Sequence, residues 1–292
     1  MERMLIIGCG DIARRTIRLL GKNYRIYALI RNGVQRDGLR AEGVCPIMGD
    51  LDNRKSLSRI TGLADIVLHL APPPNSGATD VRTRHLLAAL AQGRRPRQLI
   101  YISTSGVYGD CGGAWVDEAH TVNPQSARAQ RRVDAEAQIR HWAGANGVRA
   151  SILRVPGIYA ADRLPLERLR AGMPAIAADE DGYTNHIHAD DLARIIAAAL
   201  RRGQPNRVYH ASDDSAMKMG DYFDVVADAY HLPRPQRVSR AEARRTIPES
   251  MLSFMNESRR LTNARMKQEL QVRLNYPTVS NALADRAGDP VA

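Results

Sequence analysis

The stretch Met4-Leu-Ile-Ile-Gly-Cys-Gly-Asp-Ile-Ala13 is the most informative part of this chain of 292 residues. The apolar run 4–7 predicts a buried strand, and residues 11–20 carry apolar side chains at helical spacing. Between them stands the pattern GxGxxA, which in this context is typical of a turn that binds a dinucleotide. Gly8 permits the tight turn, Gly10 lets a diphosphate approach the backbone, and Ala13 lets helix and strand pack closely. The N-terminus of the helix then offers free N–H groups to the phosphates.

Beyond this stretch, further apolar strands alternate with helical stretches. Strands are expected at 24–30, 44–48, 65–70, 99–102 and 148–153, and helices at 79–91 and 126–143. This alternation predicts an α/β fold, a Rossmann-type doubly wound parallel sheet with right-handed crossovers. Ligands of such sheets bind beyond the carboxyl ends of the strands.

The pattern changes after Arg154, where prolines begin to interrupt the chain. We expect residues 1–155 to form the dinucleotide-binding domain, with 185–210 returning to it through a helix at 191–201 and a strand at 207–210. A smaller, interleaved C-terminal substrate lobe should take 156–184 and 211–285, including a helix at 219–230. The polar tail 286–292 should be frayed.

The composition bounds the class of protein. With 44% hydrophobic and 25% charged residues, it is that of a globular chain. We see no apolar run long enough to span a membrane and no signal peptide, which predicts a cytoplasmic location. The three cysteines form neither a disulfide framework nor a zinc pair, and we expect no metal site. Cys9 could be reactive at a helix N-terminus, but a small residue in a crowded turn is the favoured interpretation.

The net charge of +11 raises the question of nucleic acid. The 42 basic residues include only four lysines, and the arginines are spread along the chain without a basic tail. We therefore expect a small-molecule substrate rather than nucleic acid, and a monomer or homodimer.

The end of the second predicted strand bears on the choice of dinucleotide. NAD-specific folds usually place Asp or Glu there for the ribose 2′-hydroxyl, whereas this strand ends in Arg31-Asn32. Arg31, with Arg36 as a second candidate, could pair with a 2′-phosphate. This favours NADP(H); NAD(H) remains the alternative, with Arg31 then a solvated arginine.

The stretch Tyr101-Ile-Ser-Thr-Ser-Gly-Val-Tyr-Gly109 resembles the extended short-chain dehydrogenase/reductases of the nucleotide-sugar epimerase/dehydratase group. Supporting stretches lie at 49–51 (GDL), 69–71 (HLA), 153–159 (LRVPGIY), 185–191 (NHIHADD) and 258–277. The resemblance implies that the cofactor contacts the turn after each of several strands. With the glycine turn, the expected contacts are Gly8, Cys9, Gly10, Asp11, Ile12, Ala13, Arg31, Asp50, Leu51, Leu70, Ala71, Pro72, Arg132 and Pro156.

The family resemblance also implies a catalytic Ser/Thr, Tyr and Lys. Thr104 stands at the Ser/Thr position, while Pro124 and Glu136 both place the Tyr-x-x-x-Lys pair at Arg128 and Arg132. An arginine stays protonated and is a poor acid or base, so Arg128 cannot replace the tyrosine directly. Arg132 could still hold the nicotinamide ribose.

Three interpretations of this replacement stay open. The protein could be an enzyme that recruits another acid, with Tyr108, Tyr159, Tyr183, His186 and His188 as candidates, although each could equally pack in the core or, for His188, cap a helix. It could be a non-catalytic cofactor-binding regulator or redox sensor. Alternatively, Arg128 could bind an anionic group of the substrate during weakly assisted hydride transfer.

The substrate region gives weaker signals. Arg163, Arg168 and Arg259 could make the smaller lobe attract anions or could lie on the surface, and Pro72–Pro74 could stiffen the pocket wall. The expected protein is an atypical member of the group, an oxidoreductase or epimerase that acts on a secondary alcohol or carbonyl. An anionic or sugar-like small molecule is one option for its substrate.

Overall fold

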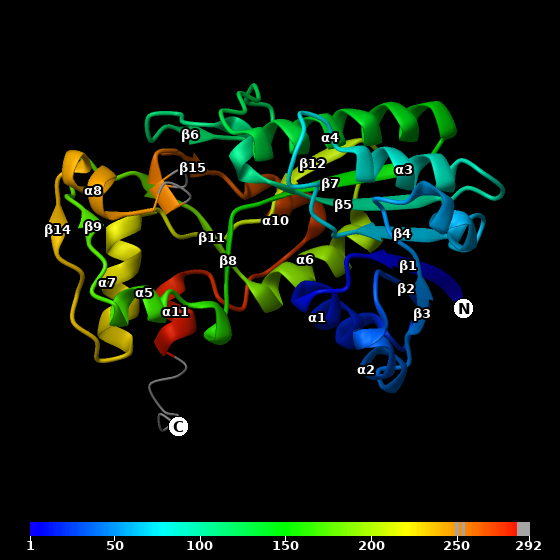
Figure 1. Ribbon diagram of the computed structural model, residues 1–292, viewed down its shortest axis with the longest axis horizontal. Helices are drawn as coiled ribbons and strands as arrows, with labels where there is room; N and C mark the ends of the chain where they lie inside the picture. The colour runs from blue at the N-terminus through cyan, green and yellow to red at the C-terminus, as the bar shows by residue number, and fades with distance from the viewer. Residues whose placement is uncertain (249–250, 253–254, 285–292) are drawn as a thin grey trace.

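The computed structural model describes residues 1–248, 251–252 and 255–284, so the predicted frayed tail 286–292 lies outside the described residues. Figure 1 shows two lobes: a larger one around the central sheet and a smaller one built mainly from the second half of the chain.

The larger lobe is built on a seven-stranded sheet in the order β12-β7-β5-β4-β1-β2-β3. Every neighbouring pair is parallel, which confirms the predicted Rossmann-type doubly wound sheet. The strands are β1 (Glu2–Ile7), β2 (Tyr24–Ile30), β3 (Cys45–Met48), β4 (Ile66–His69), β5 (Gln98–Thr104), β7 (Arg149–Val155) and β12 (Arg207–His210).

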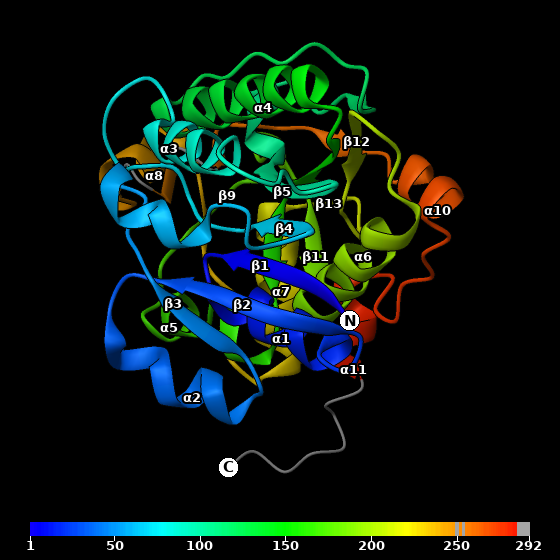
Figure 2. The same cartoon turned by 90° about the vertical axis from the view of Figure 1, so that its right-hand side faces the viewer.

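Helices cover both faces of this sheet (Figures 1 and 2). On one face lie α1 (Asp11–Leu20) and α6 (Ala189–Arg202), and on the other α3 (Val81–Leu90) and α4 (Ala127–Asn146); α2 (Arg36–Ala41) precedes β3. Met4 and Ile6 belong to the first apolar cluster, while Leu5 and Ile7 belong to the second. The run 4–7 is therefore continuously apolar because both faces of the strand are buried.

The smaller lobe has its own apolar cluster around Tyr222 and Phe223. Its helices are α5 (Leu166–Arg170), α7 (Met219–Ala229), α8 (Arg240–Thr246) and α11 (Val279–Ala284). Short strands form two-residue or three-residue pairs: β8 (Gly157–Tyr159) with β11 (His186–His188), β9 (Ala175–Ile176) with β14 (Arg237–Val238), β10 (Tyr183–Thr184) with β13 (Met217–Lys218), and β6 (Trp115–Val116) with β15 (Arg260–Leu261). Four 3₁₀ turns complete the elements that matter here: η1 (Gly33–Gln35), η2 (Arg54–Ile60), η3 (Ser105–Tyr108) and η4 (Ala161–Arg163).

One segment of the expected substrate lobe lies elsewhere. Helix α10 (Ala264–Leu270) contacts α6 and β12, and Met266, Leu270, Val272 and Leu274 join the apolar cluster of the larger lobe. Assigning all of 211–285 to the substrate lobe was therefore wrong, because the apolar face of α10 is buried against α6. Across the described residues, no helix combines the length and the apolar character that crossing a bilayer requires.

Candidate cofactor and active site

The glycine turn joins β1 to α1 under tight steric limits. Gly8 has φ +91°, and a Cβ on it would lie 2.5 Å from the backbone nitrogen of Ala71. Only glycine fits there, because the loop after β4 comes so close. A Cβ on Gly10, by contrast, would meet nothing within 4 Å. Gly10 is also the N-cap of α1 and supplies no side-chain cap, so the first helical N–H groups remain available to an anion.

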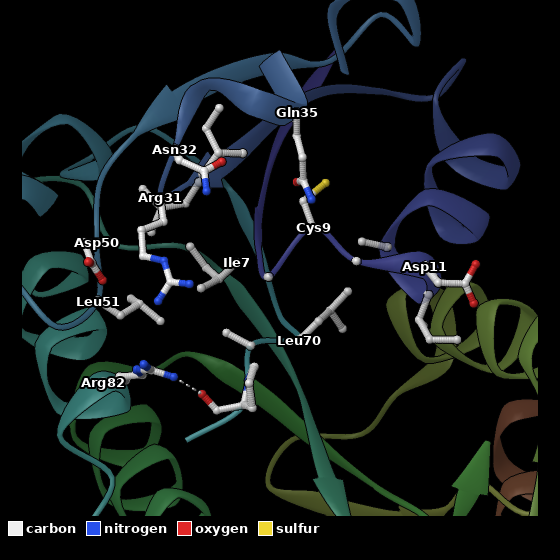
Figure 3. A pocket seen from close by; sticks show the side chains of 18 of the residues that line it. Ile7, Cys9, Asp11, Arg31, Asn32, Gln35, Asp50, Leu51, Leu70 and Arg82 are labelled. Atoms are coloured by element: carbon white, nitrogen blue, oxygen red, sulfur yellow. Dashed lines mark hydrogen bonds between the residues drawn. The ribbon is translucent and has the colours of Figure 1, made fainter. Parts of the chain in front are cut away.

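A cavity of about 490 Å³ opens beside this turn, at the carboxyl ends of β1, β2 and β4. Figure 3 shows side chains of all these strand ends converging on it. Twelve predicted cofactor residues line it: Gly8, Cys9, Gly10, Asp11, Ile12, Ala13, Arg31, Asp50, Leu51, Leu70, Ala71 and Pro72. Arg132 and Pro156, also predicted, are not among the lining residues. The small residues and the uncapped helix fit the shape and the charge of a dinucleotide.

Three arginines line the cavity, and two of them, Arg31 and Arg82, lie on the same side of it, near Asp50 and Leu51 (Figure 3). The exposed Arg31 extends into it, with its guanidinium toward Asp50 and Leu51 (Figure 3). Arg82 donates to both carboxylate oxygens of Asp52 at 2.8 and 2.7 Å, which lowers the pKa of Asp52. It also donates to the Pro72 carbonyl at 3.3 Å. Within the described part of the chain Arg31 forms no salt bridge, so it is the cation with more freedom to meet a phosphate.

Sequence reasoning missed Arg82 and misplaced Arg36. The only signal for Arg82 was its place in the first turn of the helix after the fourth strand. Arg36 lines a separate hollow with Met48 and Arg59, so the structure does not bring it to the cavity.

Ion pairs surround the N-terminus of α1. Asp11 accepts two hydrogen bonds from Nε of Arg15, at 2.9 and 3.0 Å. Arg163 of η4, in the smaller lobe, donates to the same carboxylate at 3.3 Å. Cys9 is buried, which raises the pKa of its thiol to about 11. This confirms the interpretation of Cys9 as a small residue in a crowded turn rather than a reactive thiolate.

The carboxyl end of β5 holds the candidate catalytic residues. Oγ1 of Thr104 accepts a hydrogen bond from the Gly106 N–H at 3.2 Å and so caps η3. Arg132, on α4, donates to the Ile102 carbonyl at 2.7 Å and to the Tyr101 hydroxyl at 3.0 Å. The guanidinium of Arg132 is thus already hydrogen-bonded to two groups of β5.

Arg128 lies on the first turn of α4. Partial burial lowers its pKa, and the nearby carboxylate of Glu257 opposes that shift. Glu257 in turn accepts a hydrogen bond from Arg259 at 2.9 Å, and Arg259 also donates to the Gly109 carbonyl at 2.7 Å. Arg259 is therefore a buried residue of this cluster and not a surface residue. Glu257 was missed because nothing local shows that residue 257 returns to the end of β5.

Tyr108 was a candidate acid, but it is buried in the core. Its hydroxyl accepts a hydrogen bond from Arg154 at 2.7 Å and lies 2.5 Å from Nε2 of His210. Arg154 forms a buried salt bridge with Glu136 at 2.7 Å, and Ser103 donates to the same carboxylate at 2.6 Å. The structure thus places the Tyr108 hydroxyl in this core network rather than in the cavity, and burial raises its pKa to about 12.

The remaining candidates lie at the junction of the lobes. Tyr159 is buried beside Asp213, and burial raises the pKa of both, that of Asp213 to about 7. The ring of His186 stacks on Tyr222 with centroids 4.2 Å apart, and burial lowers its pKa to about 3. Nδ1 of His188 accepts the Asp190 N–H at 3.2 Å, so the predicted helix cap is confirmed.

Two further side chains pack against neighbours. The ring of Tyr183 lies 4.5 Å from the guanidinium carbon of Arg260. Arg168 is buried over the ring of Phe223 and donates to the Pro174 carbonyl. Arg168 is therefore neither the surface residue nor the pocket cation expected from the sequence.

Comparisons with known proteins agree with this architecture. A curated ketoreductase from Stigmatella aurantiaca, which acts on 4-hydroxy-2-methyl-3-oxo-4-farnesyl-3,4-dihydroquinoline-1-oxide, is 23% identical over 244 residues, 78% of this chain and 73% of the relative. A solved protein of unknown function from Silicibacter pomeroyi has a TM-score of 0.81 and 29% identity over 99% of both chains. A UDP-glucuronic acid 4-epimerase from Bacillus cereus, solved with NAD and UDP-4-deoxy-4-fluoro-glucuronic acid, has a TM-score of 0.77 at 18% identity over 98% of both chains, a likeness of fold.

A model of the NAD dependent epimerase/dehydratase family matches residues 4–212, from the first strand to the end of the central sheet. The match includes the glycine turn and every strand of that sheet except the first two residues of β1. Because it covers well over half of the chain, this protein belongs to the NAD dependent epimerase/dehydratase family.

Proposed function

We propose that this protein is an NADP(H)-dependent oxidoreductase or epimerase that acts on a secondary alcohol or carbonyl of a small substrate with an anionic or sugar-like group. The observation that carries the proposal is the cavity at the carboxyl ends of β1, β2 and β4, lined by the glycine turn and Arg31. Family membership and the ketoreductase relative favour redox chemistry over simple binding.

The preference for NADP(H) rests on Arg31. Its guanidinium extends into the cavity from the end of β2, where a ribose 2′-substituent lies in this fold. A planar guanidinium pairs well with a phosphate, whereas a 2′-hydroxyl calls for a carboxylate. Arg82 is already paired with Asp52, so it competes less for the phosphate.

Bound cofactor would supply or accept the hydride. In our proposal the Thr104 hydroxyl orients the substrate oxygen, and Arg132 adds positive charge beside the nicotinamide ribose. Arg128 lies on the first turn of α4, near the carboxylate of Glu257. Because its guanidinium stays protonated, it holds an anionic group of the substrate. Solvent supplies the proton to the oxygen, because no residue equivalent to the family tyrosine stands at position 128.

A second candidate is a non-catalytic regulator that binds NADP(H). It is favoured by the two arginines in place of the Tyr-Lys pair and by the bonds that hold Arg132 to Tyr101 and Ile102. The two candidates share the cofactor and differ in turnover.

The first experiment measures dissociation constants of NADPH and NADH for the purified protein and for Arg31→Gln. We expect the wild type to prefer NADPH, and R31Q to lose about tenfold or more of that preference, as a charge-assisted phosphate contact requires. Arg36→Gln, outside the cavity, is the matched control and should change neither constant. Wild-type preference for NADH would overturn the role of Arg31.

The second experiment follows NADPH oxidation and NADP⁺ reduction over a panel of carbonyls and secondary alcohols, with and without carboxylate or phosphate groups. Turnover that falls with Arg128→Gln for the anionic members supports the enzyme. Tight NADPH binding without turnover across the panel supports the regulator.

A further inference from the structure

Arg163 belongs to one lobe by sequence and to the other by position. It ends the η4 turn, which follows β8 in the smaller lobe, yet it lines the cavity formed by the glycine turn of the larger lobe. Ile158 of β8 lines the same cavity. This short stretch therefore gives the cavity a wall that the Rossmann sheet does not supply.

The partner of Arg163 in this structure is Asp11. The contact is 3.3 Å long, and the Arg163 side chain is 38% exposed. Asp11 already accepts two shorter bonds from Arg15. Asp11 would therefore keep a partner if Arg163 turned toward a ligand, and an exposed pair of this kind is weak.

Asp11 creates an electrostatic problem for a diphosphate. It stands on the first turn of α1, beside Gly10, where the helix N–H groups face the cavity. A carboxylate there suits the helix dipole but repels a second anion at the same end. A cation that reaches the same place relieves this repulsion, and Arg163 is the cavity-lining residue bonded to Asp11.

The η4 turn is held beside α1 by neighbouring ion pairs. Arg15 bonds Asp190 of α6 at 2.6 Å and contacts Asp162 of η4 at 3.5 Å. These contacts keep the backbone of η4 near the mouth of the cavity, so that only the side chain of Arg163 has to turn.

We propose that Arg163 is a binding residue for the diphosphate of the dinucleotide, exchanging the Asp11 carboxylate for the phosphate oxygens. The smaller lobe then contributes directly to cofactor affinity, and cofactor binding ties the two lobes together. This inference rests on the proposed dinucleotide site, but it concerns a different phosphate group from the one assigned to Arg31. Arg163 binds the diphosphate that both cofactors share, whereas Arg31 binds the 2′-phosphate of NADP(H).

The test compares Arg163→Gln with the control Arg170→Gln, an exposed arginine on α5 in the same lobe. Titrations use NADPH, NADH and adenosine 2′-monophosphate, which has no diphosphate. We expect R163Q to weaken the binding of both dinucleotides by about tenfold, the size of one charge-assisted contact. The binding of the monophosphate should be unchanged. R170Q should match the wild type for all three ligands.

The outcomes separate this inference from the proposed function. If the wild type binds neither dinucleotide, both are overturned. If the wild type binds them and R163Q binds within twofold of it, the role of Arg163 is overturned and the cofactor site stands. An equal loss for the monophosphate would also overturn it, because Arg163 would then act on the whole site or on the 2′-phosphate.

A second pair of variants tests direct contact against mere neutralisation of Asp11. Asp11→Asn should bind dinucleotides several-fold more tightly than the wild type, since it removes the repelling charge. Introducing R163Q into D11N should still lower the affinity for dinucleotides about tenfold if Arg163 contacts the phosphates. A loss that disappears in the D11N background would overturn the contact. Thermal unfolding of each variant checks that it is folded.

Discussion

The carboxyl edge of the central sheet has two differently built ends. At β1, β2 and β4, small residues and the uncapped start of α1 surround an open cavity of about 490 Å³. At β5 and α4, the candidate catalytic side chains bind the protein itself: Thr104 caps η3, and Arg132 bonds Ile102 and Tyr101. One end leaves hydrogen-bonding groups for a ligand, whereas the other uses them to hold the fold.

The two kinds of site place different demands on the chain. A dinucleotide cradle depends on backbone N–H groups and on the absence of side chains, which one local motif can provide. The end of β5 depends on side chains from α4, from β5 and from residues 257–259, far apart in sequence.

The largest effect is expected for Glu136→Ala, behind the β5 end. The variant leaves Arg154 charged and buried, with only about 5% of its side chain exposed. Breaking such a pair costs about 3–5 kcal/mol in the free energy of unfolding, measured by urea denaturation. Glu269→Ala, which breaks the more exposed pair with Arg207, is the control and should cost less than about 1 kcal/mol. Equal losses for the two variants would contradict the buried network.

The next effect is expected at the open end, for Gly8→Ala. The new Cβ would lie 2.5 Å from the Ala71 nitrogen at φ +91°, so the loop after β4 must move. We expect about 3 kcal/mol of lost stability and loss of measurable dinucleotide binding. Gly43→Ala, with φ +76° and open space around it, isolates the backbone strain and should cost about 1 kcal/mol without affecting binding. Unchanged dinucleotide binding in G8A would contradict the assignment of the dinucleotide site to this turn.

A smaller, pH-dependent effect is expected for Asp213→Asn at the lobe junction. Burial raises the pKa of Asp213 to about 7, above its ordinary value of 3.8. The folded state then holds a proton that the unfolded state releases, so this residue lowers stability as pH rises from about 4 to 7. The rise in pKa from 3.8 to about 7 corresponds to a loss of about 4 kcal/mol, and D213N should regain about half of it or more at pH 8, with no gain at pH 4. Parallel stability curves from pH 4 to 8 would contradict the shift.

The smallest effect is expected for Arg132→Lys on α4. Nη1 of Arg132 donates to both the Ile102 carbonyl and the Tyr101 hydroxyl; lysine keeps the charge, but its shorter side chain does not bring a nitrogen to that position. We expect a loss of about 1 kcal/mol in unfolding free energy, the value of an ordinary hydrogen bond. Gln130→Lys, exposed on the same helix, is the control and should be neutral. A gain in NADPH affinity above tenfold would show that Arg132 blocks the ribose.

Much of the fold could be predicted because it depends on local pattern. The bounds of β2, β12 and α1 match the predicted 24–30, 207–210 and 11–20, since each is a clean apolar run or a helical period. Helix α10 was misassigned because the pattern of an amphipathic helix does not indicate which lobe will cover its apolar face. Tyr108 was misjudged for a similar reason, since its partners Arg154 and His210 lie 46 and 102 residues away.

Strand alternation and the steric limits at glycine act within a few residues, so the sheet, the glycine turn and the place of Arg31 at the end of β2 could be predicted from local pattern. The availability of side chains for a ligand depends instead on the packing of distant segments. This packing paired Arg82 with Asp52, committed Tyr108 to the core, and brought Glu257 and Arg163 to the sheet edge from other segments. Those outcomes depend on which distant groups lie within hydrogen-bond reach, and chain packing alone sets that distance.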